Sequence, residues 1–138
     1  MKWQVTSESD TAAVAAELAP LLKKGDVVLL KGTLGAGKTT FVRALIHHLL
    51  GNKIDVPSPT FTLLQTYTTP QFEIFHFDFY RLKTPEEAYE IGFEEALTEG
   101  VSLIEWPSKI ASLVPKKHKS ITFQLLENGD RLITAEGF

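Results

Sequence analysis

The chain has 138 residues with a formal net charge of −3, and 43% of its residues are hydrophobic. This length predicts a single domain spanning residues 1–138. No apolar run is long enough for a membrane span or a signal peptide, and the absence of cysteine excludes disulfides and thiolate metal sites, which together fit a cytoplasmic protein. Proteins that bind RNA without partners are usually basic, whereas this chain is acidic. Any contact with nucleic acid is therefore expected to be shared with partner proteins.

The first predicted helix begins at Ser7, where the sequence resembles a capping box. Val14 and three later leucines then recur at helical spacing up to Gly25. Pro20 lies inside that pattern, so the helix is expected to kink or to end there. Residues 26–31 form a short apolar run after this helix, and they predict a buried strand.

Residues 32–39 match the phosphate-binding pattern G-x-x-x-x-G-K-[ST], between that strand and a helix predicted from Lys38 to about Leu50. The glycines let backbone N–H groups surround a polyphosphate, and the helix dipole adds positive charge. Lys38 would reach the β- and γ-phosphates, while the Thr39 hydroxyl would complete a Mg²⁺ shell of phosphate oxygens and water. The pattern predicts nucleoside triphosphate binding, with the expected contacts Thr33, Leu34, Gly35, Ala36, Gly37, Lys38, Thr39 and Thr40.

The later elements predict a mixed sheet. Residues 61–67 and 72–79 indicate two strands joined by a turn at 69–71, and residues 101–104 indicate a buried strand. Residues 84–87 predict a helix start with Pro85 at the first helical position. Residues 121–126 and 131–135 flank an Asn-Gly-Asp turn, which predicts an antiparallel hairpin. The expected fold class is therefore α/β, with three layers, a small mixed sheet and a C-terminal antiparallel hairpin.

A phosphate loop needs an acidic residue at the end of a neighbouring strand to hold Mg²⁺. Glu105 follows the apolar run 101–104, and Asp78 lies in an alternating strand that would place His76, Asp78 and Tyr80 on one face. Each acid has an alternative interpretation as a salt-bridge or helix-cap residue. Both can also serve the site, one near the metal and one orienting water.

Two loop motifs follow the predicted helix. Residues 52–55 match the N-K-x-D pattern of GTPases, but they come before any metal-binding strand, so they predict a helix-exit loop and no guanine specificity. Residues 56–62 hold hydroxyls between two prolines, a stiff loop in which Thr60 could sense Mg²⁺ and the γ-phosphate as a switch. Composition alone favours a plain turn there.

Taken in order, four segments resemble the TsaE family of small bacterial ATPases required for making threonylcarbamoyladenosine in tRNA. They are GTLGAGKTTF at 32–41, SPTFTL at 58–63, HFDFYRL at 76–82 and IEWP at 104–107. The resemblance runs from the first helix to about Pro107 and implies a P-loop NTPase fold. It also implies the cofactors ATP and Mg²⁺, metal contacts from Thr39, Asp78 and Glu105, and a catalytic set of Lys38, Thr60, Asp78 and Glu105.

Three further residues belong to these segments. Trp106 is implied in function, either packed in the core beside the site or on a partner surface, and we favour the core. Tyr80 and Arg81 are part of the signature, although Arg81 could equally form a structural salt bridge. Where the family often carries an acid after its Glu-Trp-Pro segment, this chain has Ser108.

The resemblance implies action with the proteins TsaB and TsaD. TsaD transfers the threonylcarbamoyl group to an adenosine beside the anticodon. ATP hydrolysis would return the complex to its starting state between turnovers. The chain is expected to contact tRNA only within the complex. The chain has three arginines and no insert long enough for a substrate-closing lid, which leaves little to clamp a second phosphorylated substrate. The alternatives are a nucleotide-gated assembly factor and, ranked lower, a small-molecule kinase. The oligomeric state stays open.

Overall fold

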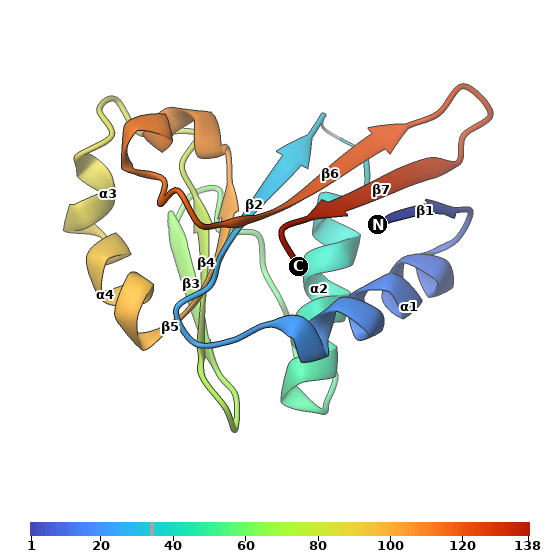
Figure 1. Ribbon diagram of the computed structural model, residues 1–138, viewed down its shortest axis with the longest axis horizontal. Coiled ribbons are helices and arrows are strands. Elements are labelled where there is room, and N and C mark those ends of the chain that lie inside the picture. Colours follow the sequence, from blue (N-terminus) through green and yellow to red (C-terminus); the bar gives the residue numbers. More distant parts are fainter. Residues whose placement is uncertain (34) are drawn as a thin grey trace.

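The computed structural model describes residues 1–33 and 35–138, and the predicted contact Leu34 lies outside the described residues. Within those residues seven strands form one sheet in the order β1-β7-β6-β2-β5-β4-β3 (Figure 1). Their bounds are β1 Lys2–Val5, β2 Val27–Gly32, β3 Leu64–Thr68, β4 Glu73–Asp78, β5 Gly100–Glu105, β6 Lys119–Leu125 and β7 Arg131–Glu136.

The sheet is mixed, as predicted. Strand β2 pairs in parallel with β5 and β6, and β4 pairs in parallel with β5. Strand β3 is antiparallel to β4, and β7 is antiparallel to both β6 and β1. The predicted C-terminal hairpin is confirmed as β6 and β7. Strand β1 was not predicted, because its four residues carry too short a pattern and its pairing partner lies at the other end of the chain.

Helices cover both faces of the sheet (Figure 1). Helices α1 and α2 lie on one face, while α3, α4 and η2 lie on the other, which confirms the predicted three layers. Their bounds are α1 Glu8–Leu18, η1 Ala19–Leu21, α2 Lys38–Leu50, α3 Glu87–Glu90, α4 Phe93–Glu99 and η2 Pro107–Leu113. None of these described helices is long and apolar enough to cross a bilayer.

The predicted limits of the first two helices hold. The Ser7 hydroxyl accepts a hydrogen bond from the Asp10 N–H at 3.1 Å, which caps α1. Helix α1 ends at Leu18, and Pro20 lies in the following 3₁₀ turn η1. Helix α2 ends at Leu50 and is capped by Gly51, whose φ of 79° is a left-handed conformation that suits glycine.

Two predicted boundaries are wrong. The strand expected from residue 61 begins only at Leu64, because the chain turns first and leaves the Phe61 side chain 77% exposed. The helix expected to start at Pro85 begins at Glu87, after a turn in which the Glu87 N–H donates to the Thr84 carbonyl oxygen at 3.2 Å. Local propensity indicates that such an element exists but defines its first residue less well.

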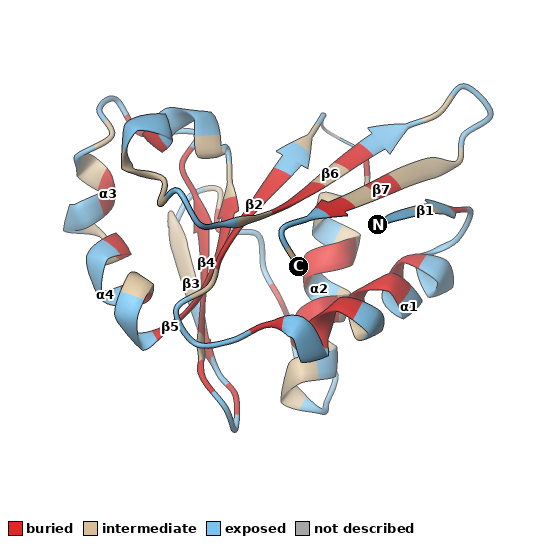
Figure 2. Ribbon diagram, viewed as in Figure 1, coloured by how far each residue is buried: buried red, intermediate tan, exposed pale blue. Residues whose placement is uncertain are grey.

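Two apolar clusters lie on the two faces of the sheet, and β2 contributes to both. Figure 2 shows buried residues along the central strands and on the helices. Val28 and Leu30 face α1 and α2, while Val27 and Leu29 face α4 and η2. A parallel strand covered on both faces has no solvent side, which explains its continuous apolar run. The C-terminal end of this central strand carries the phosphate loop.

Gly100 begins β5 at a point where the sheet leaves no room for a side chain. A Cβ there would collide with the Glu73 carbonyl oxygen and lie 2.9 Å from the Phe75 ring. We expect Gly100→Ala to lower the free energy of unfolding by about 1–3 kcal/mol, because the overpacking must displace the neighbouring strand. Urea denaturation measures this loss.

A matched control is Ser102→Ala on the same strand. The Ser102 hydroxyl is buried without a hydrogen-bond partner among the described residues, so a methyl group should be tolerated or stabilising. An equal loss in both variants would mean that any substitution weakens β5, and the steric explanation for Gly100 would be wrong.

Candidate functional site

The phosphate loop connects β2 to α2 with an open helix N-terminus. Gly35 and Gly37 have φ angles of 82° and 105°, which residues with a Cβ rarely adopt. Gly37 occupies the N-cap position of α2, and no side chain caps the first N–H groups of that helix. Uncapped N–H groups and the helix dipole make this end of α2 suited to an anion.

Lys38 turns its ammonium group back over the loop. Its Nζ donates a hydrogen bond to the Gly32 carbonyl oxygen at 2.9 Å and lies 5.4 Å from the centre of the Trp106 ring. The side chain is half-buried, and it lines a cavity beside the loop.

Two carboxylates meet at the carboxyl ends of β4 and β5. Asp78 and Glu105 are direct partners in the parallel register of these strands, and both lie on the face that α2 covers. Asp78 is 4% exposed. The alternating pattern correctly placed His76 and Asp78 on one face, although β4 ends before Tyr80.

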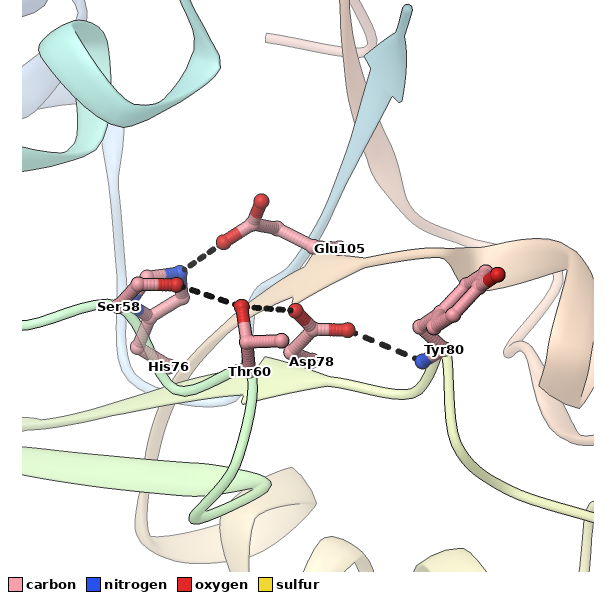
Figure 3. A network of polar contacts seen from close by, with 6 residues as sticks. All are labelled: Ser58, Thr60, His76, Asp78, Tyr80 and Glu105. Carbon is pink, nitrogen blue, oxygen red and sulfur yellow. Dashed lines mark hydrogen bonds and ion pairs between the residues drawn. The ribbon is translucent and has the colours of Figure 1, made fainter. Parts of the chain in front are cut away.

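Each carboxylate is oriented by hydrogen bonds (Figure 3). Glu105 Oε2 lies 2.7 Å from His76 Nε2, and the His76 side chain is buried, only 3% exposed. The Asp78 carboxylate accepts from the Thr60 hydroxyl at 3.2 Å and from the Tyr80 N–H at 3.0 Å. Contacts within the protein therefore fix the position of both carboxylates.

The proline-rich segment 56–62 is irregular with turns, as composition predicted, but it reaches the acids. The Ser58 and Thr60 hydroxyls lie 2.8 Å apart, and Thr60 continues to Asp78 (Figure 3). Residues 52–55 lie in the segment leaving α2, where His47 Nε2 is 2.7 Å from the Ile54 carbonyl oxygen. The prediction of a helix-exit loop is confirmed.

A cavity of about 640 Å³ joins the loop, the acids and the switch-like segment. The predicted residues that line it are Gly35, Gly37, Lys38, Thr39, Thr40, Thr60, Asp78 and Glu105. Thr33 and Ala36 do not line it, and Ala36 is instead packed in the apolar cluster beneath the loop. The cavity also takes in residues outside the predicted set: Ser58, Tyr80, Trp106 and Arg131.

Trp106 is not a core residue, and our preference for the core is wrong. Its side chain is 42% exposed, and its ring centre lies 4.8 Å from that of Tyr80 at the mouth of the cavity. Its φ of 60° is left-handed, which turns the chain after Glu105 and aims the indole at Lys38. Arg81 lies 4.4 Å from the Phe61 ring centre and forms no salt bridge within the described residues.

Sequence reasoning missed Ser58, which lines the cavity, and two residues whose contacts join distant segments. His76 was placed on the right face but was not predicted to hold Glu105, since the contact joins two strands. Arg131 comes from the C-terminal hairpin and contacts the carbonyl oxygen of Gly35, which lies 96 residues earlier in the sequence. No motif around Arg131 signals that contact.

The side chains present fit a phosphate ligand with a divalent cation. Lys38 and the uncapped helix end supply positive charge and N–H donors, whereas Thr39, Asp78 and Glu105 supply the oxygen ligands that Mg²⁺ prefers. Within residues 1–33 and 35–138, no group of three His, Cys, Asp or Glu side chains is arranged to hold a metal alone.

Comparison with known proteins agrees with this arrangement. Residues 5–133 match the family described as "Threonylcarbamoyl adenosine biosynthesis protein TsaE". A TsaE protein of Rickettsia typhi, named for tRNA threonylcarbamoyladenosine biosynthesis, is 48% identical over 93% of this chain and 89% of its own length. The Bacillus subtilis protein of the same name is 35% identical over 97% of this chain and 84% of its own.

A solved structure shows the same fold. The crystal structure of Bacillus subtilis YdiB superposes with a TM-score of 0.81 at 32% identity, covering 98% of this chain and 83% of that one. The family match spans the phosphate loop, both carboxylates, all of β6 and the first residues of β7. The chain therefore belongs to the TsaE family of threonylcarbamoyladenosine biosynthesis proteins.

Proposed function

We propose that the chain binds ATP with Mg²⁺ in this cavity and hydrolyses it, as the ATPase component of the machinery that makes threonylcarbamoyladenosine in tRNA. One observation carries the proposal: the phosphate loop, Lys38 and two oriented carboxylates line a single cavity. A phosphate-binding loop alone would only bind the nucleotide. Carboxylates fixed beside the loop can also orient a water molecule for attack on the γ-phosphate.

Each residue has a distinct task in this proposal. The loop N–H groups and Lys38 hold the β- and γ-phosphates, and Lys38 offsets charge that develops during transfer. Thr39, Glu105 and Asp78 would hold Mg²⁺, which when bound neutralises phosphate charge. Asp78 or Glu105 accepts a hydrogen bond from the attacking water and so orients it. Thr60, bonded to Asp78, links the segment 56–62 to the state of the site.

The partner proteins in this proposal are TsaB and TsaD. The relatives are named for a biosynthesis whose product is a modified nucleoside in tRNA. The net charge of −3 also disfavours independent RNA binding. We accordingly expect the isolated chain to hydrolyse ATP slowly and to hydrolyse it faster with TsaB and TsaD. Contact with tRNA is expected only within the complex.

The experiment that tests this function is ATP hydrolysis by the purified chain, alone and with TsaB and TsaD. Lys38→Ala is the control, since it removes the phosphate contact. Activity that rises with the partners and vanishes in the variant supports a partner-activated ATPase. Equal rates with and without partners would refute the coupling. Tight ATP binding without turnover in either condition would leave a nucleotide-gated assembly factor.

His76 is expected to position Glu105. His76→Leu should lower kcat for ATP hydrolysis about tenfold or more with little change in KM, because Glu105 loses the hydrogen bond that orients it. His76→Gln keeps an N–H donor near Nε2 and should retain most of the activity. Steady-state hydrolysis measures both constants.

The matched control for His76 is Phe75→Leu, a buried neighbour on the opposite face of β4. It should alter stability without lowering kcat selectively. If Gln and Leu at position 76 reduced kcat equally, His76 would have only a packing role.

A further inference from the structure

Arg131 is the first residue of β7, and its side chain lies along the phosphate loop. Its Nε and Nη2 lie 3.4 and 3.3 Å from the Gly35 carbonyl oxygen. Its Cδ lies 3.1 Å from where a Cβ at Gly37 would be, so the arginine stem occupies space that a larger residue there would take. A residue of the C-terminal hairpin therefore contacts the phosphate loop through its guanidinium group.

The guanidinium group of Arg131 is available to a ligand. No carboxylate of the described residues forms a salt bridge with it, and its main polar contact is a neutral carbonyl. The side chain lines the same cavity as Lys38. Because its edge rests on the loop carbonyl and no ion pair of the described residues covers it, the planar face of the guanidinium is available to a ligand in the cavity.

The strand order places Arg131 at the end of the cavity opposite to the acids. Strand β2 carries the phosphate loop, with β5 and β4, which end at Glu105 and Asp78, on one side. Strands β6 and β7, which carries Arg131, lie on the other side (Figure 1). If the proposed function holds, the γ-phosphate points toward the acids, and the nucleoside end of the nucleotide extends toward the hairpin.

We propose that Arg131 contacts the nucleoside of the bound nucleotide, with its guanidinium plane packed on the base. Arginine suits this contact because its planar group stacks on aromatic faces while its edge keeps the hydrogen bonds to Gly35. This inference rests on the proposed ATP site. It assigns the C-terminal hairpin to nucleotide affinity, separate from the acids that serve hydrolysis.

Calorimetric titration of the full chain with ATP and with inorganic tripolyphosphate tests the assignment. Arg131→Ala should weaken ATP binding about 3- to 30-fold and leave tripolyphosphate binding nearly unchanged, because only ATP carries the base. Arg131→Lys should resemble the alanine variant, since it restores the charge but not the planar group. Arg43→Ala is the matched control, an exposed arginine on α2 that does not line the cavity.

Each other outcome overturns the assignment. An equal loss for tripolyphosphate, or rescue by lysine, would make Arg131 a phosphate contact or a support of the loop. Unchanged ATP affinity in Arg131→Ala would remove it from the site. Failure of the underlying function is distinguished by Lys38→Ala: if that variant binds both ligands as well as the unsubstituted chain does, the cavity is not the ATP site.

Discussion

Replacing Glu105 by Gln is expected to lower the rate of ATP hydrolysis about 100-fold or more while ATP still binds. The amide has the shape of the carboxylate, and its carbonyl oxygen can accept the hydrogen bond from His76 that orients Glu105. What is lost is the negative charge beside the proposed metal and water positions. Hydrolysis at saturating ATP and calorimetric ATP binding measure the two effects separately.

Glu99→Gln is the control for Glu105→Gln. It makes the same chemical change at the end of α4, where the side chain is 57% exposed and 3.9 Å from Lys24. It should leave hydrolysis unchanged, because exposed ion pairs contribute little. A Glu105→Gln protein with full activity would remove Glu105 from the proposed chemistry.

The same variant separates the two functions that the site supports. If tRNA modification with TsaB and TsaD continued at its normal rate while hydrolysis was abolished, the chain would act as a nucleotide-gated assembly factor. Lost modification with intact assembly would support the ATPase. Transfer of labelled γ-phosphate to any acceptor other than water would instead indicate a kinase.

Phe93→Ala is expected to cost about 3–5 kcal/mol of unfolding free energy, a large part of the 5–15 kcal/mol that typical domains have. Phe93 is fully buried, and it meets the Phe77 and Phe79 rings edge-on at centroid distances of 5.8 and 5.9 Å. Truncation would leave a cavity between α4 and the sheet, where edge-to-face ring contacts are also lost. Urea denaturation measures the change.

Phe93→Leu should cost less than about 1.5 kcal/mol, because a similar apolar volume remains. Urea denaturation of Phe93→Ala with saturating ATP gives an independent measurement. If ATP binds as proposed, ATP at 100 times its Kd should raise the free energy of unfolding of the variant by about 2.7 kcal/mol. If the alanine variant unfolded at the same urea concentration as the unsubstituted chain, the aromatic cluster would not support α4 as described.

The sequence alone determined the features that depend on neighbouring residues. The phosphate loop needs glycines and a lysine at fixed spacing between a strand and a helix, and all of these lie within about twenty residues. The limits of α2, the end of α1 before Pro20 and the C-terminal hairpin follow from equally local rules for caps, proline and turns. The three-layer mixed fold follows in turn from the order of such elements.

Only the tertiary structure decided which side chains complete the site. The contact of His76 with Glu105 depends on the register of two strands, and that of Arg131 with Gly35 depends on the hairpin lying beside β2. Trp106 was misjudged because an apolar side chain predicts burial on average, whereas its left-handed backbone turns it to the cavity mouth. Strand β1 was missed for a related reason, since its stability comes from pairing with β7. Contacts between distant segments arise from packing the whole sheet, and no local pattern encodes them.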